Sequence, residues 1–116
     1  MHLNSLHAIG NLTRNPELRY TPSGTAIVSM GLAINRRFNQ GDDVKEEVCF
    51  IDVVAFGKTA EHCAQYLVKG QQVLVEGRLQ QQRWETEDGS KRSKHEIVAE
   101  RVQFGAKPKG DADASH

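Results

Sequence analysis

Hydrophobic and polar side chains alternate along residues 26–35. Every second residue of this segment is apolar, namely Ala26, Val28, Met30, Leu32 and Ile34. Successive side chains of a β-strand point to opposite faces of its sheet, so a period of two is typical of a strand with one buried face. We therefore predict a half-buried strand here.

Four other segments alternate less regularly but still favour strands. They are residues 3–12, 48–56, 72–84 and 94–104. The first contains Gly10, and a glycine inside a strand often marks a bulge or a bend. Turns are predicted at residues 21–24, which contain Pro22 and Gly24, and around residues 88–90.

One segment has the spacing of a helix instead. In residues 58–69 the small and apolar side chains recur three and four positions apart, at Ala60, Cys63, Ala64 and Leu67. Gly70 follows as a C-terminal stop signal. We predict a single short helix over residues 58–69.

The order of these elements is β-β-β-α-β-β. Five strands with one helix between the third and fourth are expected of an OB-fold, a partly open Greek-key β-barrel that often binds oligonucleotides or oligosaccharides. We predict an all-β fold with one short helix, forming one OB-fold domain over residues 1–105. Residues 106–116 contain no large apolar side chain and are predicted to be a disordered tail.

Composition agrees with one globular domain. Hydrophobic residues make up 38% and charged residues 26% of the 116 residues, which is ordinary for such a domain. No apolar run approaches the roughly 18 residues of a membrane-spanning helix. Residues 1–8 lack the charged start and apolar stretch of a signal peptide. A cytoplasmic location is expected.

The sequence offers little to a catalytic or metal-binding interpretation. The five histidines are scattered, and no HExxH, GxSxG, GxxxxGK[ST] or GxGxxG motif occurs. Cys49 and Cys63 are too far apart for a CxxC pair, and no second pair could complete a zinc site. We predict no enzyme activity, no catalytic residue, no metal site and no cofactor.

The few aromatic residues are informative by position. Aromatics make up only 6% of the chain. Phe50 and Phe56 lie on the face of their predicted strand opposite Ile51, Trp84 ends the outward set of a later strand, and Phe38 lies in a predicted polar loop over residues 35–45. Phe50 and Phe56 could simply cover the second side of a sheet. Together with Trp84 and Phe38, they instead favour a row of stacking platforms for nucleic-acid bases.

Charge adds to this picture only through its distribution. Lys plus Arg and Asp plus Glu both number 15, so the net charge does not indicate a polyanionic partner. An OB barrel would nevertheless bring basic residues beside the aromatics. Sequence-independent binding of single-stranded DNA, by stacking plus phosphate contacts, is the favoured function. The candidate phosphate contacts are Arg14, Arg36, Arg37, Lys58, Arg78, Arg83, Lys91, Arg92 and Lys94.

Four segments, in order, resemble the bacterial single-stranded DNA-binding protein family. They read NPELRYTPSG (15–24), VVAFGK (53–58), YLVKG (66–70) and VEGRL (75–79), and the resemblance extends over residues 3–104. It implies an OB-fold that assembles as a homotetramer, a dimer of dimers, and coats single-stranded DNA in the nucleoid during replication, recombination and repair. It also implies base stacking at Phe38, Phe50, Phe56 and Trp84.

The chain departs from the family pattern at several points. Phe38 and Phe50 occupy positions that are often tryptophan, which implies weaker stacking. Asp52 shares the face of Phe50 and Phe56, where a carboxylate repels phosphate unless a neighbour pairs with it. The family's acidic C-terminal tip is absent before His116. Recruitment of replication and repair proteins is therefore in doubt, and a truncated chain, a short DNA-uptake paralogue and a phage version stay open.

Two other functions remain as alternatives. One is a primosome-type module that mainly bridges replication proteins, and the other is an OB-fold nuclease, for which no acidic metal cluster is visible. Apolar residues opposite the predicted core sets, Leu6, Ile27 and Val98, are expected to contribute to a subunit interface.

Overall fold

The computed structural model describes residues 1–108, which form six strands and one helix. These elements all lie within residues 6–104. They are β1 (Leu6–Leu12), β2 (Glu17–Tyr20), β3 (Ala26–Gln40), β4 (Asp43–Phe56), α1 (Gly57–Tyr66), β5 (Gln72–Glu85) and β6 (Lys91–Phe104). Most of the predicted tail, residues 109–116, lies outside the described part of the chain.

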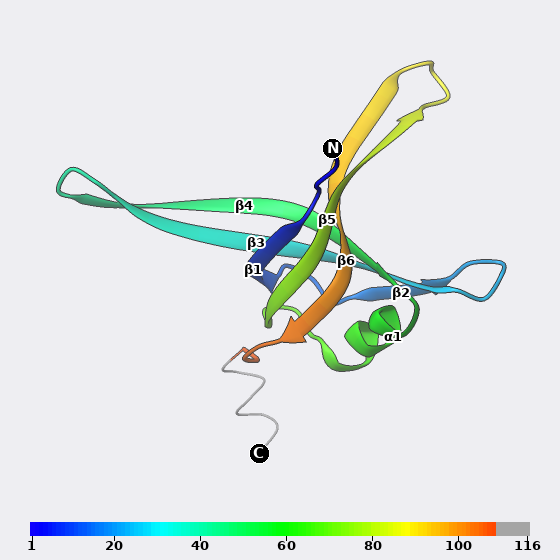
Figure 1. The fold of residues 1–116 in the computed structure, drawn as a ribbon, viewed down its shortest axis with the longest axis horizontal. Coiled ribbons are helices and arrows are strands. Elements are labelled where there is room, and N and C mark those ends of the chain that lie inside the picture. Colours follow the sequence, from blue (N-terminus) through cyan, green and yellow to red (C-terminus); the bar gives the residue numbers. More distant parts are fainter. Residues whose placement is uncertain (109–116) are drawn as a thin grey trace.

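Five of the strands close into a barrel. The sheet order is β1-β5-β6-β4-β3-β2, and an additional pairing of β1 with β3 joins the two ends, with Asn11 opposite Ala33 and Leu12 opposite Leu32. All pairs are antiparallel except β4 with β6. The chain path in Figure 1 is that of an OB-fold barrel, as predicted.

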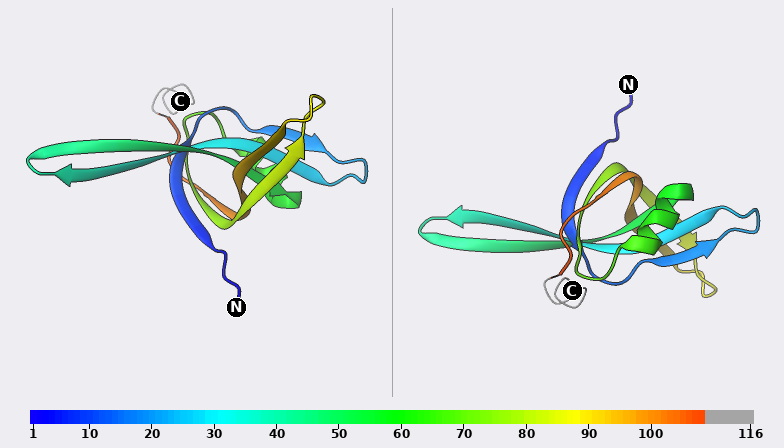
Figure 2. Two further views of the ribbon diagram at one scale, coloured as in Figure 1. Left: turned by 90° about the horizontal axis from the view of Figure 1, so that it is seen from above. Right: turned by 90° about the horizontal axis from the view of Figure 1, so that it is seen from below.

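The interior of the barrel follows the predicted alternation. The fully buried large side chains are Val28, Met30, Leu32, Val53, Cys63, Val73, Val75 and Ile97. Helix α1 packs against β3 and β4, through the buried residues Ala60 and Cys63. In Figure 2 it lies on the side of the molecule away from the long β3–β4 hairpin. One hydrophobic core therefore holds the barrel and the helix together.

The short strand β2 was not predicted. It covers four residues, all exposed, and pairs with β3 from Glu17 opposite Ser29 to Tyr20 opposite Ala26. The segment has no buried side, so its sequence carries no period of two. Backbone pairing creates this strand, which lies outside the closed barrel.

The loop predicted over residues 35–45 is wrong. Strands β3 and β4 pair without interruption from Ile27 opposite Phe56 to Gln40 opposite Asp43, and Gly41 takes a positive φ of 66° at the turn. The hairpin extends well beyond the barrel (Figure 1). Both of its faces are solvated there, so polar side chains replace the alternation that would have indicated strands.

The helix is shorter than predicted, ending at Tyr66. Leu67 already has an extended conformation, with φ −92° and ψ 146°, and its N–H bonds to the carbonyl of Cys63 at 3.0 Å. Leu67 is still buried, at 4% exposure, so it packs in the core from an extended residue rather than from the helix. Gly70, at φ 89°, belongs to the turn that follows.

Candidate nucleic-acid interface

Strand β4 has two faces of opposite character. Ile51, Val53 and Ala55 point to the core, whereas Phe50 and Phe56 on the other face are 72% and 46% exposed. We call this second side, with the residues that share it by strand register, the outer face. Large aromatic rings left in water have a cost that burial would have removed. Their exposure therefore marks a surface suited to a flat partner.

Strand register places Trp84 on the outer face as well. Strand β6 pairs with β4 at Asp52 opposite Glu96, and with β5 at Glu96 opposite Gln80. Trp84 is an even number of residues beyond Gln80 along β5 and lies opposite Arg92. Directly opposed residues project to the same side of a sheet. Trp84, 47% exposed, therefore continues the face that begins on β4.

Phe38 lies on the other side of the β3–β4 hairpin. It is opposite Lys45, which is an odd number of residues from Phe50 along β4, and side chains alternate between faces. The Arg36 guanidinium lies over the Phe38 ring, 4.9 Å from its centre, and also pairs with Glu47 at 3.2 Å. A nucleic-acid strand whose bases stack on Phe50 could reach Phe38 only by crossing the edge of the β3–β4 hairpin.

The basic residues predicted to contact phosphates also divide between the outer face and the opposite side. Arg37, Arg78, Arg92 and Lys94 share the outer face by register, with Arg78 paired to Glu100 at 3.6 Å. Lys58 follows Phe56 at the start of α1. The remaining hairpin residues are on the opposite faces of their hairpins, namely Arg36, Arg83 and Lys91.

Asp52, in the middle of the outer face, is paired with cations. Its carboxylate oxygens lie 3.8 Å from Arg14 Nη1 and 3.9 Å from Lys94 Nζ. Lys94 also lies 3.7 Å from Glu96, which is nearly buried and accepts a 3.1 Å hydrogen bond from Gln80. The Asp52 carboxylate is therefore paired, which is the condition under which a carboxylate on this face need not repel phosphate.

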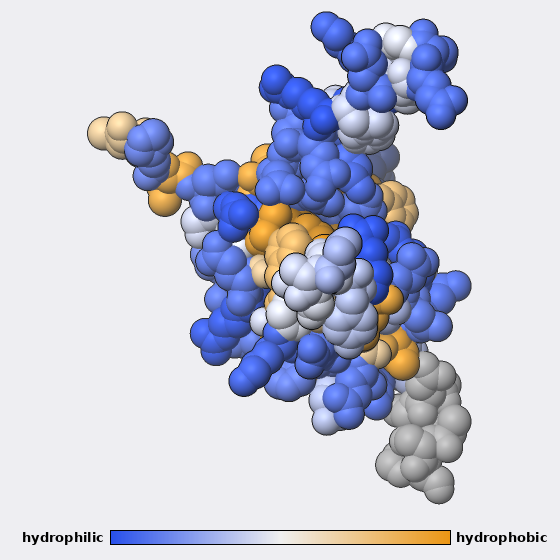
Figure 3. Space-filling view, turned by 90° about the vertical axis from the view of Figure 1, so that its right-hand side faces the viewer, coloured by the Kyte–Doolittle hydropathy of each residue, from blue (hydrophilic) through white to orange (hydrophobic). Residues whose placement is uncertain are grey.

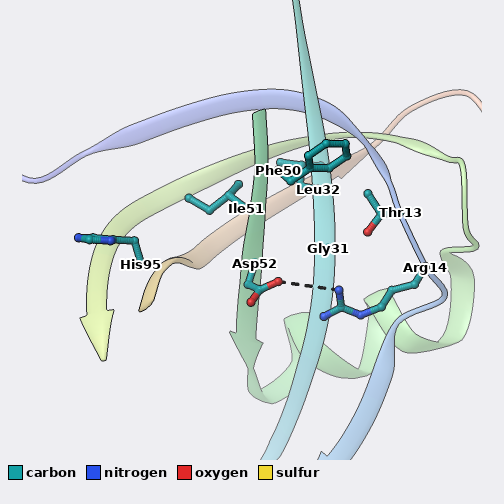
Figure 4. Close-up of a pocket in the computed structure, with 8 residues that line it drawn as sticks. All are labelled: Thr13, Arg14, Gly31, Leu32, Phe50, Ile51, Asp52 and His95. Atoms are coloured by element: carbon teal, nitrogen blue, oxygen red, sulfur yellow. Dashed lines mark ion pairs between the residues drawn. The ribbon is translucent and has the colours of Figure 1, made fainter. Parts of the chain in front are cut away.

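Arg14 reaches the outer face because Gly31 has no side chain. Gly31 is directly opposite Asp52 in the register of β3 and β4. A Cβ at Gly31 would collide with the Thr13 hydroxyl and lie 2.5 Å from Arg14 Nη1. Figure 4 shows the Arg14 side chain crossing β3 at Gly31 to meet Asp52. A glycine is required for this close approach.

A hollow surrounds this ion pair. Phe50 and Leu32 lie at one end of it in Figure 4, and His95 of β6 lies at another. The sequence did not single out Thr13, Gly31 or His95. For His95 the alternation of residues 94–104 was the available signal, but a lone histidine beside Lys94 carries no motif.

A second hollow lies on the β5–β6 hairpin. Its lining includes Trp84, Arg92, Arg83 and Lys91, so both faces of this ribbon present cations around the tryptophan. The hairpin turn is ordered by Asp88, which accepts hydrogen bonds from the Thr86 hydroxyl and, at 3.0 Å, from the Ser90 N–H. These bonds lower the pKa of the Asp88 carboxyl.

The end of the molecule that carries the β2–β3 hairpin is mainly polar (Figure 3). Figure 3, which looks onto the end of the molecule with the β2–β3 hairpin, shows a hydrophilic surface with a limited hydrophobic area near its middle. Within residues 1–108 no group of three or more His, Cys, Asp or Glu side chains is placed to hold a metal ion. Nor does that part of the chain contain a helix long and apolar enough to cross a membrane.

Comparison with known proteins identifies relatives of this barrel. The single-stranded DNA-binding proteins of Helicobacter hepaticus and Helicobacter pylori are 54% and 48% identical to the chain, over 93% and 97% of it. The chain spans only 65% and 63% of their lengths.

A solved structure, the Plasmodium falciparum SSB complex with ssDNA, superposes with a TM-score of 0.84 at 21% identity. It covers 91% of this chain, and 97% of that chain is matched, so the two share the fold. The model of the single-strand binding protein family matches residues 3–105. The protein therefore belongs to the single-strand binding protein family.

Proposed function

We propose that this protein binds single-stranded DNA without sequence preference, catalyses no reaction, and protects the DNA in replication, recombination and repair. The observation that carries the proposal is the exposure of Phe50, Phe56 and Trp84 on one continuous face of the sheet. The relatives named above are single-stranded DNA-binding proteins, which supports the same function.

Stacking explains why the base sequence of the DNA would have little effect on affinity. Every base has a π-face, and a base stacked on an aromatic ring contributes roughly 1–3 kcal/mol whatever its identity. Three rings on the outer face could therefore supply most of the affinity, with Phe38 acting where the DNA passes around the β3–β4 hairpin. The nine basic residues predicted from the sequence would contact phosphates, which are also common to all sequences.

A titration with poly-dT tests the proposal directly. Trp84 is the only tryptophan in the chain, so a change in fluorescence reports on the outer face alone. We expect quenching on binding, weaker binding as salt rises, similar affinity for mixed sequences, and no competition from duplex DNA. Absence of both quenching and salt dependence would overturn it. Labelled DNA incubated with Mg²⁺ should stay intact, and cleavage that tracks the purified protein would exclude the non-catalytic role.

We further propose a homotetramer, a dimer of dimers, acting in the cytoplasm on nucleoid DNA. Ile9 of β1 is 56% exposed beside the partly buried Leu74, an apolar strip that a second copy could cover. Of the residues first considered for this role, Val98 is buried within the chain and Leu6 packs against the core, which leaves Ile27 partly exposed. Light scattering should give the mass of four chains, and a monomer would refute the assembly.

A further inference from the structure

Asp52 lies in the middle of the row of aromatic rings. It is two residues from Phe50 along β4, with Phe56 beyond it on the same face. Alternate residues of a strand are about 6.7 Å apart. A DNA strand that stacks on both rings must therefore pass close to the Asp52 carboxylate.

The carboxylate occupies a position that suits a phosphate. Arg14 comes from the segment after β1 and Lys94 from β6, and they approach different oxygens of Asp52 at 3.8 and 3.9 Å. Two cations around one oxyanion is an arrangement by which proteins also bind phosphate groups. Both cations are among the phosphate contacts predicted from the sequence.

The ion pairs of Asp52 with Arg14 and Lys94 are of a kind that can exchange the carboxylate for another anion. The side chains of Arg14, Lys94 and Asp52 are 43%, 43% and 47% exposed, and the distances are long for charge-assisted hydrogen bonds. Solvent-exposed pairs of this kind contribute little to stability. Glu96 differs, because it is nearly buried and held by Gln80. It keeps Lys94 partly neutralised, whereas Arg14 has Asp52 as its one acidic partner in residues 1–108.

We propose that Asp52 is an intramolecular competitor of DNA phosphate. It holds Arg14 and Lys94 while the protein is free and must release them to the DNA, so it weakens binding and reduces the dependence of affinity on salt. The inference rests on the proposed DNA binding and assigns a function to the exposed acid at the centre of the outer face, where the neighbouring Glu96 is buried.

The test compares Asp52→Asn with the unaltered protein in binding to oligo-dT over a salt series. Asn keeps the shape of the side chain but removes the charge. We expect affinity to rise about fivefold at low salt, the effect of removing one charge about 4 Å from another in a solvated site. The slope of log affinity against log salt should steepen by roughly 0.7 for each additional phosphate that the protein neutralises.

Glu61→Gln is the matched control. It removes the same charge from the exposed side of α1, so it should change affinity little. The variant Arg14→Gln should weaken binding more in the Asp52→Asn background than alone, because only there is Arg14 fully available. Thermal unfolding of each variant reports whether the fold is kept.

Each result bears on one conclusion. Unchanged or weaker binding by Asp52→Asn, or an equal gain from Glu61→Gln, overturns the competitor role, and weaker binding would make Asp52 a positioning residue instead. If none of the proteins, including the unaltered one, binds oligo-dT, the proposed function itself fails.

Discussion

The two faces of the β3–β4 sheet have similar residue types but different uses. Leu32 and Val53 on the inner face are fully buried, whereas Phe50 and Phe56 on the outer face are 72% and 46% exposed. Burial of the inner set stabilises the barrel in proportion to the area removed from water. The outer set gains that energy only when a ligand covers it. The same hydrophobic chemistry therefore serves stability on one side of the sheet and recognition on the other.

The largest effect is expected from the inner face. Met30→Ala should lower the free energy of unfolding by roughly 2–5 kcal/mol, because Met30 is fully buried and its loss leaves a cavity in a closed core. Chemical denaturation measures this loss. The variant that remains folded should bind DNA with nearly unchanged affinity. A large loss of affinity without loss of stability would break the distinction between the faces.

At Phe50 we expect the opposite result, a loss of DNA affinity without a loss of stability. Phe50→Ala should cost roughly 1–3 kcal/mol of binding to poly-dT, the value of one stacked base, and leave the unfolding midpoint nearly unchanged. Phe50→Leu is the control, since it keeps apolar area but loses the π-face and should be almost as weak. Phe50→Trp should bind more tightly, and no gain from it would count against stacking.

A smaller effect is expected at Phe38. Its ring lies on the opposite side of the β3–β4 hairpin and is already covered by Arg36. Phe38→Ala should therefore cost less binding energy than Phe50→Ala, below about 1 kcal/mol for short oligonucleotides that occupy only the outer face. The difference in lost binding energy between the two variants should narrow for longer DNA that can cross the hairpin edge. Equal losses with short oligonucleotides would show that the two rings act on one DNA path.

The smallest perturbation compares the buried cysteine with the exposed one. Burial raises the pKa of the Cys63 thiol to about 11, so the reactive thiolate is scarce at pH 8, while Cys49 lies exposed on the β3–β4 hairpin. A thiol reagent at pH 8 should modify one cysteine in the folded protein and both after denaturation. Cys49→Ser, as control, should abolish the fast reaction. Rapid modification of Cys63 in the native protein would contradict its burial.

The barrel was predictable because its core strands alternate. The buried apolar positions of β3, namely Ala26, Val28, Met30 and Leu32, were inferred from a period of two, and Phe50, Phe56 and Trp84 were selected because they fell outside the core sets. Strand β2 and the outer half of the β3–β4 hairpin were missed. Their residues are solvated on both sides, so backbone pairing, which leaves no pattern in the side chains, decides their structure.

The order of side chains along the chain was thus enough to specify the barrel, its core and the aromatic rings left outside it, because burial selects residue types locally. The side of the hairpin on which Phe38 lies, and the pairing of Asp52 with cations, depended on which strands are neighbours and in what register. The ion pair of Arg14 with Asp52 needs three distant segments and the space over Gly31. Only the closed tertiary structure brings these together, since no local preference links them.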